Sequence, residues 1–412
     1  MTNNKDKKVL NVPNLRFLEF TGEWKKCIIG ELTTKVGSGV TPRGGEAVYK
    51  SEGHPFVRSQ NVGLGHLILD DIAYIDEDTH QRQKNTELQL DDVLLNITGA
   101  SIGRSALVNQ QIVGGNVNQH VCIIRANKKL IPSFLCNFLL SQYGQKQIES
   151  FQAGGNRQGL NFEQIKSIKI GLPSVEEQKK IADLLLLIEQ RIITQNKIIE
   201  KYESLIQAIC NTLIEAEQPK VELSFNDFGE PYSGLSGKSS EDFGKGCQYI
   251  TYMNVYQNQI IDITDVGFVK INETEQQSVV RYGDILFTLS SETPNEVGMG
   301  AVYLGDTYPL YLNSFCFGVH IIDESKIFPP FLAYYISTKS FRKAVFPLAQ
   351  GSTRFNLQKS DFMKKKFLFP TVEKQNKIYS VLKAYSDKLS IEKNIANLLC
   401  EQKSYLLRQL FI

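Results

Sequence analysis

Side chains able to form paired hydrogen bonds gather in glycine-rich stretches of both halves of the chain. They are Thr98, Ser101, Arg104, Asn118, Gln119, Asn156, Arg157 and Gln158 in the first half, and Ser290, Ser291, Thr353 and Arg354 in the second. Asn, Gln and Arg can make bidentate hydrogen bonds to base edges, and hydroxyls and glycine amides can approach phosphates. These residue types also suit ordinary turns. The twelve residues are therefore candidate DNA contacts, and a structural turn is the alternative for each.

Arg157 and Arg354 are the strongest of these candidates because they occupy matching places in the two halves, 197 residues apart. Both follow a glycine by two or three positions. A glycine lets a DNA strand or another backbone approach closely. The alternative for each arginine is a salt bridge or a contact to a long helix.

The sequence motifs of several enzyme classes are absent. There is no Gly-x-x-x-x-Gly-Lys-Ser/Thr phosphate loop, and the Gly-x-Gly pairs lack the third glycine of a dinucleotide site. Phe328-Pro329-Pro330-Phe331 has no carboxamide or carboxylate at its first position that could accept the hydrogens of a target amine. Glu177 and Lys179 have the spacing of a nuclease pair but no acidic partner in a preceding strand. Histidines and cysteines show no metal-ligand spacing. We therefore predict no catalytic and no metal-binding residues.

Composition indicates a folded protein that does not hold DNA by charge alone. The 412 residues are 42% hydrophobic and 22% charged, with a formal net charge of +2. An unaided DNA-binding protein would usually be more basic, so either the basic residues cluster or a partner supplies part of the grip. No apolar run is long enough for a bilayer, the N-terminus has no signal-peptide stretch, and seven scattered cysteines suit reduced thiols. We expect a cytoplasmic protein without membrane contact.

Internal repetition is the strongest signal in the sequence. Three positions that open a long apolar-striped segment recur with one offset of 197 residues: Pro173, Gln178, Ile181 and Pro370, Gln375, Ile378. Upstream, Asp92-Val93-Leu94-Leu95 resembles Asp284-Ile285-Leu286-Phe287 at an offset of 192. Each half thus consists of a strand-rich globular part followed by one long helix.

Both long helices carry apolar residues with a period of 3.5. In the series that begins at Ile181, nine of ten positions are apolar, and in the series that begins at Ile378, eight of ten are apolar. This period favours a coiled-coil seam over a helix packed on its own domain, which is the alternative. Gln195 and Glu392 fall at equivalent seam positions, where they either set the register or mark a local opening. Ser174 and Glu177 have the spacing of a capping box.

The predicted fold is α+β with a pseudo-two-fold repeat, in which two mixed α/β recognition domains are separated by the two helices. The expected divisions are a tail at 1–20, a first domain at 21–174, a helix at 175–216, a linker at 217–224, a second domain at 225–370 and a second helix at 371–412. Within the domains, Pro132 to Glu149 and Pro329 to Lys343 are expected to be helical, each with a proline near its start.

This arrangement resembles the specificity subunits of type I restriction-modification systems. The two repeated helix starts carry the resemblance, together with the segment Trp24 to Pro42, which looks like that family's opening motif for a recognition domain. The second half departs from this motif, since it has no tryptophan and no Thr-Pro after Ser233-Gly234.

The resemblance implies that the two long helices form an antiparallel coiled coil with a recognition domain at each end. It also implies that each domain reads one half of a split DNA site and that the helix pair sets the gap. It also implies two methyltransferase subunits that use S-adenosylmethionine, and restriction subunits that use ATP and magnesium. Those cofactors belong to the partners, and none is expected in this chain. Two alternatives are a DNA methyltransferase with degenerate motifs and a non-catalytic coiled-coil scaffold.

Overall fold

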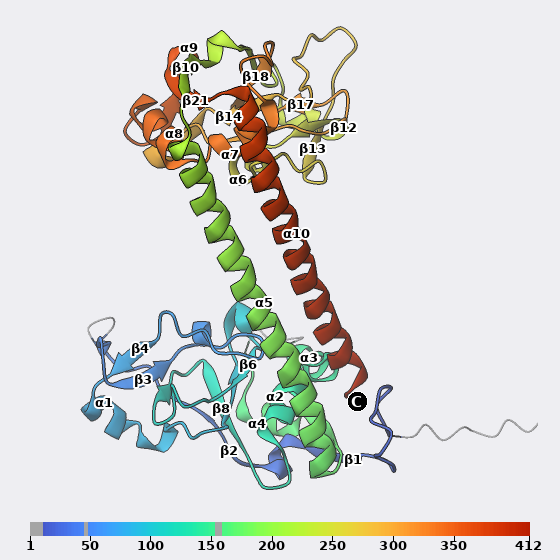
Figure 1. Ribbon diagram of the computed structural model, residues 1–412. Coiled ribbons are helices and arrows are strands. Elements are labelled where there is room, and N and C mark those ends of the chain that lie inside the picture. Colours follow the sequence, from blue (N-terminus) through green and yellow to red (C-terminus); the bar gives the residue numbers. More distant parts are fainter. Residues whose placement is uncertain (1–10, 45–47, 153–158) are drawn as a thin grey trace, which may run out of the picture. The chain divides into compact units, whose positions relative to one another are not determined.

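Two long helices, α5 (Val175–Ala216) and α10 (Val372–Gln409), connect the parts of the computed structural model, which describes residues 11–44, 48–152 and 159–412 (Figure 1). The chain divides into a first unit, Met1–Asn196 with Asn394–Ile412, and a second unit, Lys197–Lys393. Each unit therefore contains one globular domain and one half of each long helix. The first half of α5 lies with the last half of α10, so the helices run antiparallel.

Both domains contain the same three sheets. The first has β2 (Thr33–Ser38), β8 (Val121–Ala126), β5 (Val93–Asn96) and β6 (Ser105–Leu107) in one antiparallel sheet, then β4 (Ala73–Ile75), β3 (His54–Val57) and β7 (Asn116–Val117), then β1 (Lys25–Ile28) with β9 (Lys169–Leu172). The second repeats them as β11 (Gly229–Ser233), β18 (Cys316–Ile321), β14 (Ile285–Thr288) and β16 (Gly300–Val302), then β13 (Val266–Val269), β12 (Phe243–Ile250) and β17 (Tyr311–Leu312), then β10 (Lys220–Ser224) with β21 (Lys366–Pro370). The second domain also has a small sheet of β15 (Ser290–Ser291), β20 (Phe355–Leu357) and β19 (Ala349–Gln350).

Three of the shorter helices repeat. They are α2 (Pro132–Leu140), α3 (Gln142–Ser150) and α4 (Phe162–Ser167) in the first unit, and α7 (Pro329–Tyr335), α8 (Lys339–Val345) and α9 (Lys359–Lys364) in the second. The helices α1 (Glu77–Arg82) and α6 (Tyr252–Gln257) are not counterparts, because α1 follows β4 and α6 follows β12. The continuous helices expected at 132–149 and 329–343 are each broken in two. Ser141 and Thr338 leave the helical conformation at the breaks, and their side-chain oxygens accept from Gly144 N and Phe341 N to start the next helix.

The helix seam is confirmed. All twenty seam positions of α5 and α10 are buried or half-buried, including Gln195 and Glu392, each 8% exposed. In the first unit, Leu185 and Ile188 of α5 share a core with Leu406 of α10 and with Leu410, which directly follows that helix. The same core takes in residues of α2, so the helices pack on the domain as well as on each other. The alternative of a helix packed only on its own domain does not hold.

The end of α10 belongs to the core of the first domain, which the sequence did not indicate. Phe411 leaves the helix and its ring lies against Phe134 and Phe138 of α2, with ring centroids 5.1 and 6.2 Å apart. Leu15 N donates to Gln409 O over 3.0 Å, so part of the segment expected as a tail is fixed to the helix end. Lys403, the one charged residue in the seam of the second helix apart from Glu392, forms an ion pair with Glu189 of α5.

The repeated glutamine joins each domain to the helix that follows it. The Gln178 side chain is fully buried, accepts from Ile131 N over 2.8 Å, and donates to Lys129 O and Pro173 O over 3.0 and 3.1 Å. Gln375 does the same, because it accepts from Phe328 N and donates to Lys326 O and Pro370 O. One carboxamide thus satisfies three backbone groups at the start of each long helix, which explains why this residue recurs.

The expected capping box at the start of α5 is only half formed. Ser174 Oγ accepts from Glu177 N over 3.2 Å, as predicted. The Glu177 carboxylate does not return to Ser174, because it accepts from Arg16 Nε and Nη2 over 2.7 and 2.8 Å and from Trp24 Nε1 over 3.2 Å. Glu177 is 1% exposed, and a buried carboxylate needs such partners.

Replacing Gln178 by alanine is expected to lower the free energy of unfolding of the first unit by about 3 kcal/mol, because three backbone groups lose their partner at about 1 kcal/mol each. Trp24 is the only tryptophan and is buried beside Glu177, so its fluorescence during urea unfolding reports on this unit. The control is Gln190→Ala on the exposed side of the same helix, with an expected change within about 0.5 kcal/mol. Equal stability of the two variants would contradict the role assigned to Gln178.

Candidate DNA interface

Two short turns, residues 118–120 and 313–315, are built alike, and we call them the twin turns. In each, an asparagine side chain accepts from the backbone two residues later: His120 N to Asn118 Oδ1 over 3.0 Å and Phe315 N to Asn313 Oδ1 over 2.9 Å. This is the Asx turn that asparagine forms with its own backbone. The twin turns lie directly before β8 and β18, at an offset of 195 residues.

The surrounding backbone hydrogen bonds of the twin turns are duplicated too. In the first domain they are Asn118 N to Val57 O (3.1 Å), Ile97 N to His120 O (3.0 Å) and Leu160 N to Ile97 O (2.9 Å). In the second they are Asn313 N to Ile250 O (3.0 Å), Leu289 N to Phe315 O (2.9 Å) and Leu357 N to Leu289 O (2.8 Å). These three backbone hydrogen bonds, which we call the frame, are thus the same in both domains, whereas the side chains of the twin turns differ.

The first domain presents hydrogen-bonding side chains on this frame. His120 Nδ1 shares a hydrogen bond with Thr98 Oγ1 over 2.5 Å, and its Nε2 lies 3.0 Å from Gln119 Nε2. Gln119 Oε1 also accepts from Thr41 N over 3.0 Å. Ser101 Oγ accepts from the buried Asn96 over 3.1 Å. Thr98 and Gln119, predicted from the sequence, are therefore linked through His120, and Ser101 follows Thr98 by three residues.

The second domain presents an arginine, hydroxyls and aromatic rings at the matching place. Ser291 pairs with Phe355 between β15 and β20, which brings Arg354 beside Ser290 and Ser291. These three predicted residues line a cavity of about 310 Å³. Its other walls include the parallel rings of Tyr252 and Tyr256, whose centroids are 6.0 Å apart. The hydrogen bond to Glu296 raises the pKa of Tyr256, and burial raises that of Tyr252.

The remaining predicted residues have different surroundings. Asn118 is 7% exposed and its carboxamide oxygen is used by the turn, so it positions the frame rather than facing solvent. Arg104 and Thr353 are exposed. Arg354 is exposed too, and no salt bridge to it occurs among the residues that the structure describes. The predictions at Asn156, Arg157 and Gln158 lie outside the described residues.

Equivalent side chains of α3 and α8 hold the loop that lies beside each twin turn. Gln145 Nε2 donates to Gly103 O over 3.0 Å. Arg342, 197 residues later, donates to Gly298 O and Val297 O over 2.7 Å and to Asn295 O over 2.8 Å. Burial lowers the pKa of Arg342 from its ordinary value. These two side chains therefore fix the loops that follow β5 and β14, although they do not face the surface sites.

A buried carboxylate fixes the strands behind the twin turns. Asp92 accepts from Arg125 Nε and Nη2, each over 2.7 Å, and this hydrogen bonding raises the pKa of Arg125. Asp284, its counterpart, accepts instead from Tyr232 Oη over 2.8 Å and pairs with His320 Nδ1 at 2.9 Å. Burial, with the nearby Asp284 charge, raises the pKa of Tyr232 well above its ordinary value. Both arrangements tie β5 or β14 to its neighbour β8 or β18.

Sequence reasoning missed the aromatic residues of this surface. Tyr252, Tyr256 and Phe315 were not candidates, because residue type alone does not separate a surface ring from a core ring. The alignment of Val121–Ala126 with Cys316–Ile321 at the offset of 195 would have placed Phe315 opposite His120. Phe315 is 59% exposed.

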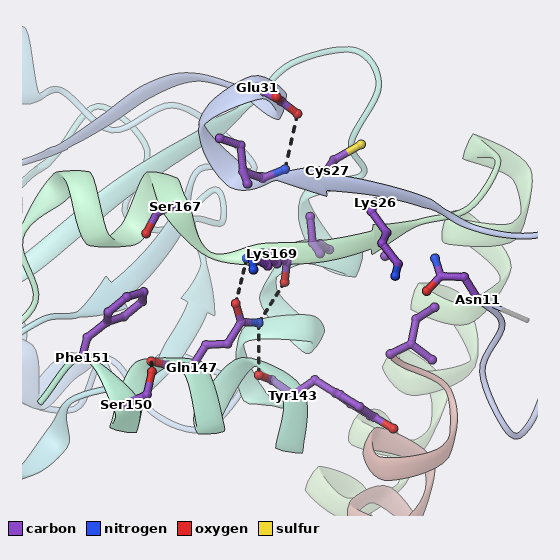
Figure 2. Close-up of a pocket in the computed structure, with 14 residues that line it drawn as sticks. Asn11, Lys26, Cys27, Glu31, Tyr143, Gln147, Ser150, Phe151, Ser167 and Lys169 are labelled. Carbon is purple, nitrogen blue, oxygen red and sulfur yellow. Dashed lines mark hydrogen bonds between the residues drawn. The ribbon is translucent and has the colours of Figure 1, made fainter. Parts of the chain in front are cut away.

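A larger cavity lies elsewhere and shows no catalytic arrangement among the described residues. It measures about 890 Å³ and lies between the strands β1 and β9, the helix α3 and Ile412 (Figure 2). Gln147 fastens α3 to β9 there, with its carboxamide accepting from Lys169 N and donating to Lys169 O, both over 2.8 Å. The described residues that line it include Lys26 and Lys169 but no histidine and no pair of acidic side chains.

Other kinds of site find no support in the described ranges. Within residues 11–44, 48–152 and 159–412, no three histidine, cysteine or acidic side chains come together in a way that could hold a metal ion. In the same ranges, none of the helices has the length and apolar character needed to cross a bilayer.

Comparison with known proteins identifies a family. The family model described as type I restriction modification DNA specificity domain matches residues 21–204 and 235–401. The specificity subunit of the type I restriction enzyme EcoKI from Escherichia coli K12 is 21% identical, over 91% of this chain and 85% of that subunit. A putative MjaX specificity subunit from Methanocaldococcus jannaschii is 22% identical, over 91% and 89%.

Solved structures show the same fold. The S subunit of a type I restriction-modification system from M. genitalium superimposes with a TM-score of 0.54 at 17% identity, covering 97% of this chain and 99% of that one. A chain from a structure of type I restriction-modification complex assembly superimposes with a TM-score of 0.59, also at 17% identity, covering 93% and 96%.

Replacing Arg342 by methionine is expected to free the loop after β14, because three carbonyl groups lose their donor. Hydrogen–deuterium exchange of residues 294–298 should accelerate tenfold or more, while residues 99–103 keep their rate. Gln145→Leu should accelerate exchange of residues 99–103 and leave the rate of residues 294–298 unchanged. Each variant is therefore the control for the other. Unchanged exchange in the loop next to the substitution would show that these side chains do not hold it.

Proposed function

Since this chain belongs to the family of type I restriction-modification DNA specificity domains, we propose that it is the DNA sequence-recognition subunit of such a complex, and that each of its domains reads one half of a bipartite site. The observation that carries the proposal is the duplicated frame of the twin turns, which presents His120, Gln119 and Thr98 in one domain and Phe315, Ser290 and Arg354 in the other. Identical frames with different side chains suit two different half-sites, because base edges are distinguished by donors, acceptors and methyl groups.

Arg354 is the main candidate for a base contact in the second domain. Its guanidinium is exposed, it lies at the edge of a cavity with Ser290 and Ser291, and arginine is the residue best suited to pair with guanine. The hydroxyls beside it suit phosphate oxygens. In the first domain, Gln119 and Arg104 are the exposed residues with matching chemistry.

The long helices are proposed to set the gap between half-sites and to bind the methyltransferase subunits. Their buried seam leaves other apolar side chains in solvent, among them Leu186 and Leu187 of α5, which are 53% and 59% exposed, and Leu398 of α10, which is 63% exposed. Large exposed apolar side chains on one element are typical of interaction surfaces. Two methyltransferase subunits and the restriction subunits are the proposed partners.

Chemistry is assigned to those partners. S-adenosylmethionine would serve the methyltransferase subunits, and ATP and magnesium the restriction subunits, whereas this chain contributes recognition. The family match supports this function rather than a degenerate methyltransferase or a scaffold without DNA contact.

Exchanging the first domain, residues 21–174, for that of another specificity subunit is expected to change one half of the methylated motif and to keep the other half. The reason is that each domain carries its own frame and its own core. Genome-wide methylation sequencing of cells that express the chain with its methyltransferase subunits measures both halves at once. The matched control exchanges residues 225–370 and should change the other half only. Loss of methylation at both halves in either chimaera would contradict the modular proposal.

Lengthening both helices by seven residues is expected to widen the gap without changing either half-site. Seven residues keep the seam in register and add about 10.5 Å, close to three base pairs. The insertions belong after Tyr202 and after Lys393, so that Glu203 and Lys393, which form an ion pair, stay together in the second unit. The same sequencing gives the result. An unchanged gap in a variant that still methylates DNA would refute the spacing role.

A further inference from the structure

We propose that Phe315 is a specificity-determining residue of the second domain and that its ring contacts the 5-methyl group of a thymine in the half-site of that domain. This inference rests on the proposed function, because it requires that the second domain contacts DNA. It goes further by assigning one side chain to one chemical group. Phe315 occupies the same place on the duplicated frame as His120, yet its ring is apolar, whereas the ring of His120 carries hydrogen-bonding nitrogens.

The ring is exposed on a rigid support. Phe315 is 59% exposed, although both of its backbone groups are used: its N–H donates to Asn313 Oδ1 over 2.9 Å and its carbonyl accepts from Leu289 N over 2.9 Å. Directly after it, Cys316 begins strand β18 and is fully buried. A large apolar side chain gains nothing for folding in such a position. Its backbone is nevertheless fixed, so the ring is presented to whatever binds this surface.

Hydrogen-bonding groups lie on both sides of the ring. On one side, Phe315 borders the cavity of about 310 Å³ that also contains Ser290 and Arg354. On the other side, it borders a second cavity of about 380 Å³ that contains Ser239 and Ser240. The ring therefore lies between two cavities whose walls combine hydrogen-bonding groups with apolar side chains such as Met253 and Phe243. The first cavity contains three of the residues predicted to contact DNA, together with the carboxylates of Glu292 and Glu296.

DNA offers one apolar group that suits an exposed aromatic ring such as that of Phe315. In the major groove, each base pair presents donors and acceptors, and the only apolar group is the 5-methyl of thymine. Serine and arginine on either side of the ring can bind phosphates and neighbouring base edges. In the first domain the matching side chain, His120, offers ring nitrogens that engage Thr98 and Gln119, so a polar base edge is expected there.

The test uses DNA in which single thymines of the second half-site are replaced by uracil, which lacks only the methyl group. The full complex with its methyltransferase subunits is used, and the half-site of the second domain is first identified by exchange of residues 225–370. At one thymine, uracil should weaken binding about fourfold in the wild type, the effect of burying one methyl group. In Phe315→Ala, thymine and uracil should bind equally at that position.

Two variants separate this contact from other roles of the ring. Phe268→Ala, which removes another exposed phenylalanine of the same domain, should keep the fourfold preference for thymine. Phe315→His, which installs the side chain of the first domain, should lose the preference while the other bases of the half-site are still read. Both positions are exposed, so folding should be unaffected.

Several results would overturn the proposal. Equal binding of uracil and thymine at every position of the half-site would do so, as would a half-site without an A·T pair. If Phe315→Ala weakened binding although uracil and thymine were equivalent, the ring would act as a wedge between bases and not as a reader of the methyl group. A wild-type complex without any sequence preference would instead refute the proposed function itself.

Discussion

Two buried carboxamides, Gln178 and Gln375, are the constraint on which the architecture depends. Each satisfies three backbone groups that belong to the end of a strand and to the segment before α2 or α7, while its own backbone lies in the first turn of a long helix. A buried amide with all its partners present is stable, whereas the loss of one partner leaves an unsatisfied group. Each domain is therefore joined to its long helix in one defined way, and the same way is used twice.

The parts of the fold that could be predicted are those encoded locally in the sequence. The 3.5-residue period predicted the seam, and the recurrence of Gln178 as Gln375 marked the two helix starts before their hydrogen bonds were visible. Contacts between distant residues could not be predicted. Glu177 fits a capping box by spacing, but its carboxylate binds Arg16, 161 positions away. Phe411 lies in the range expected for the second helix, yet its ring packs against Phe134 of the first domain.

The candidate site also has a part that residue type indicates and a part that only the three-dimensional structure shows. Residue type directed attention to Ser290, Ser291 and Arg354, which the small sheet of β15 and β20 brings together, and their contact with DNA stays a prediction. The same reasoning overlooked Phe315, because an aromatic residue in a strand-rich domain is ordinarily part of a core. Only the three-dimensional frame shows that residue 315 occupies the place of His120. Asn118, chosen as a contact by its amide, is needed by the frame itself.

The duplicated frame separates stability from recognition. The residues that support the frame include buried groups that need a partner. In the first domain, Asp92 accepts hydrogen bonds from Arg125. In the second domain, His320 occupies the position of Arg125, and Asp284 contacts both His320 and Tyr232. A frame residue can therefore change only if its partners change with it. Exposed residues of the twin turns, such as Phe315, contribute little to folding, so they can change without changes elsewhere. If these exposed turn residues contact DNA as proposed, new sequence preferences can arise by single substitutions. Such substitutions leave the core, the helix seam and the contacts of Gln178 and Gln375 intact.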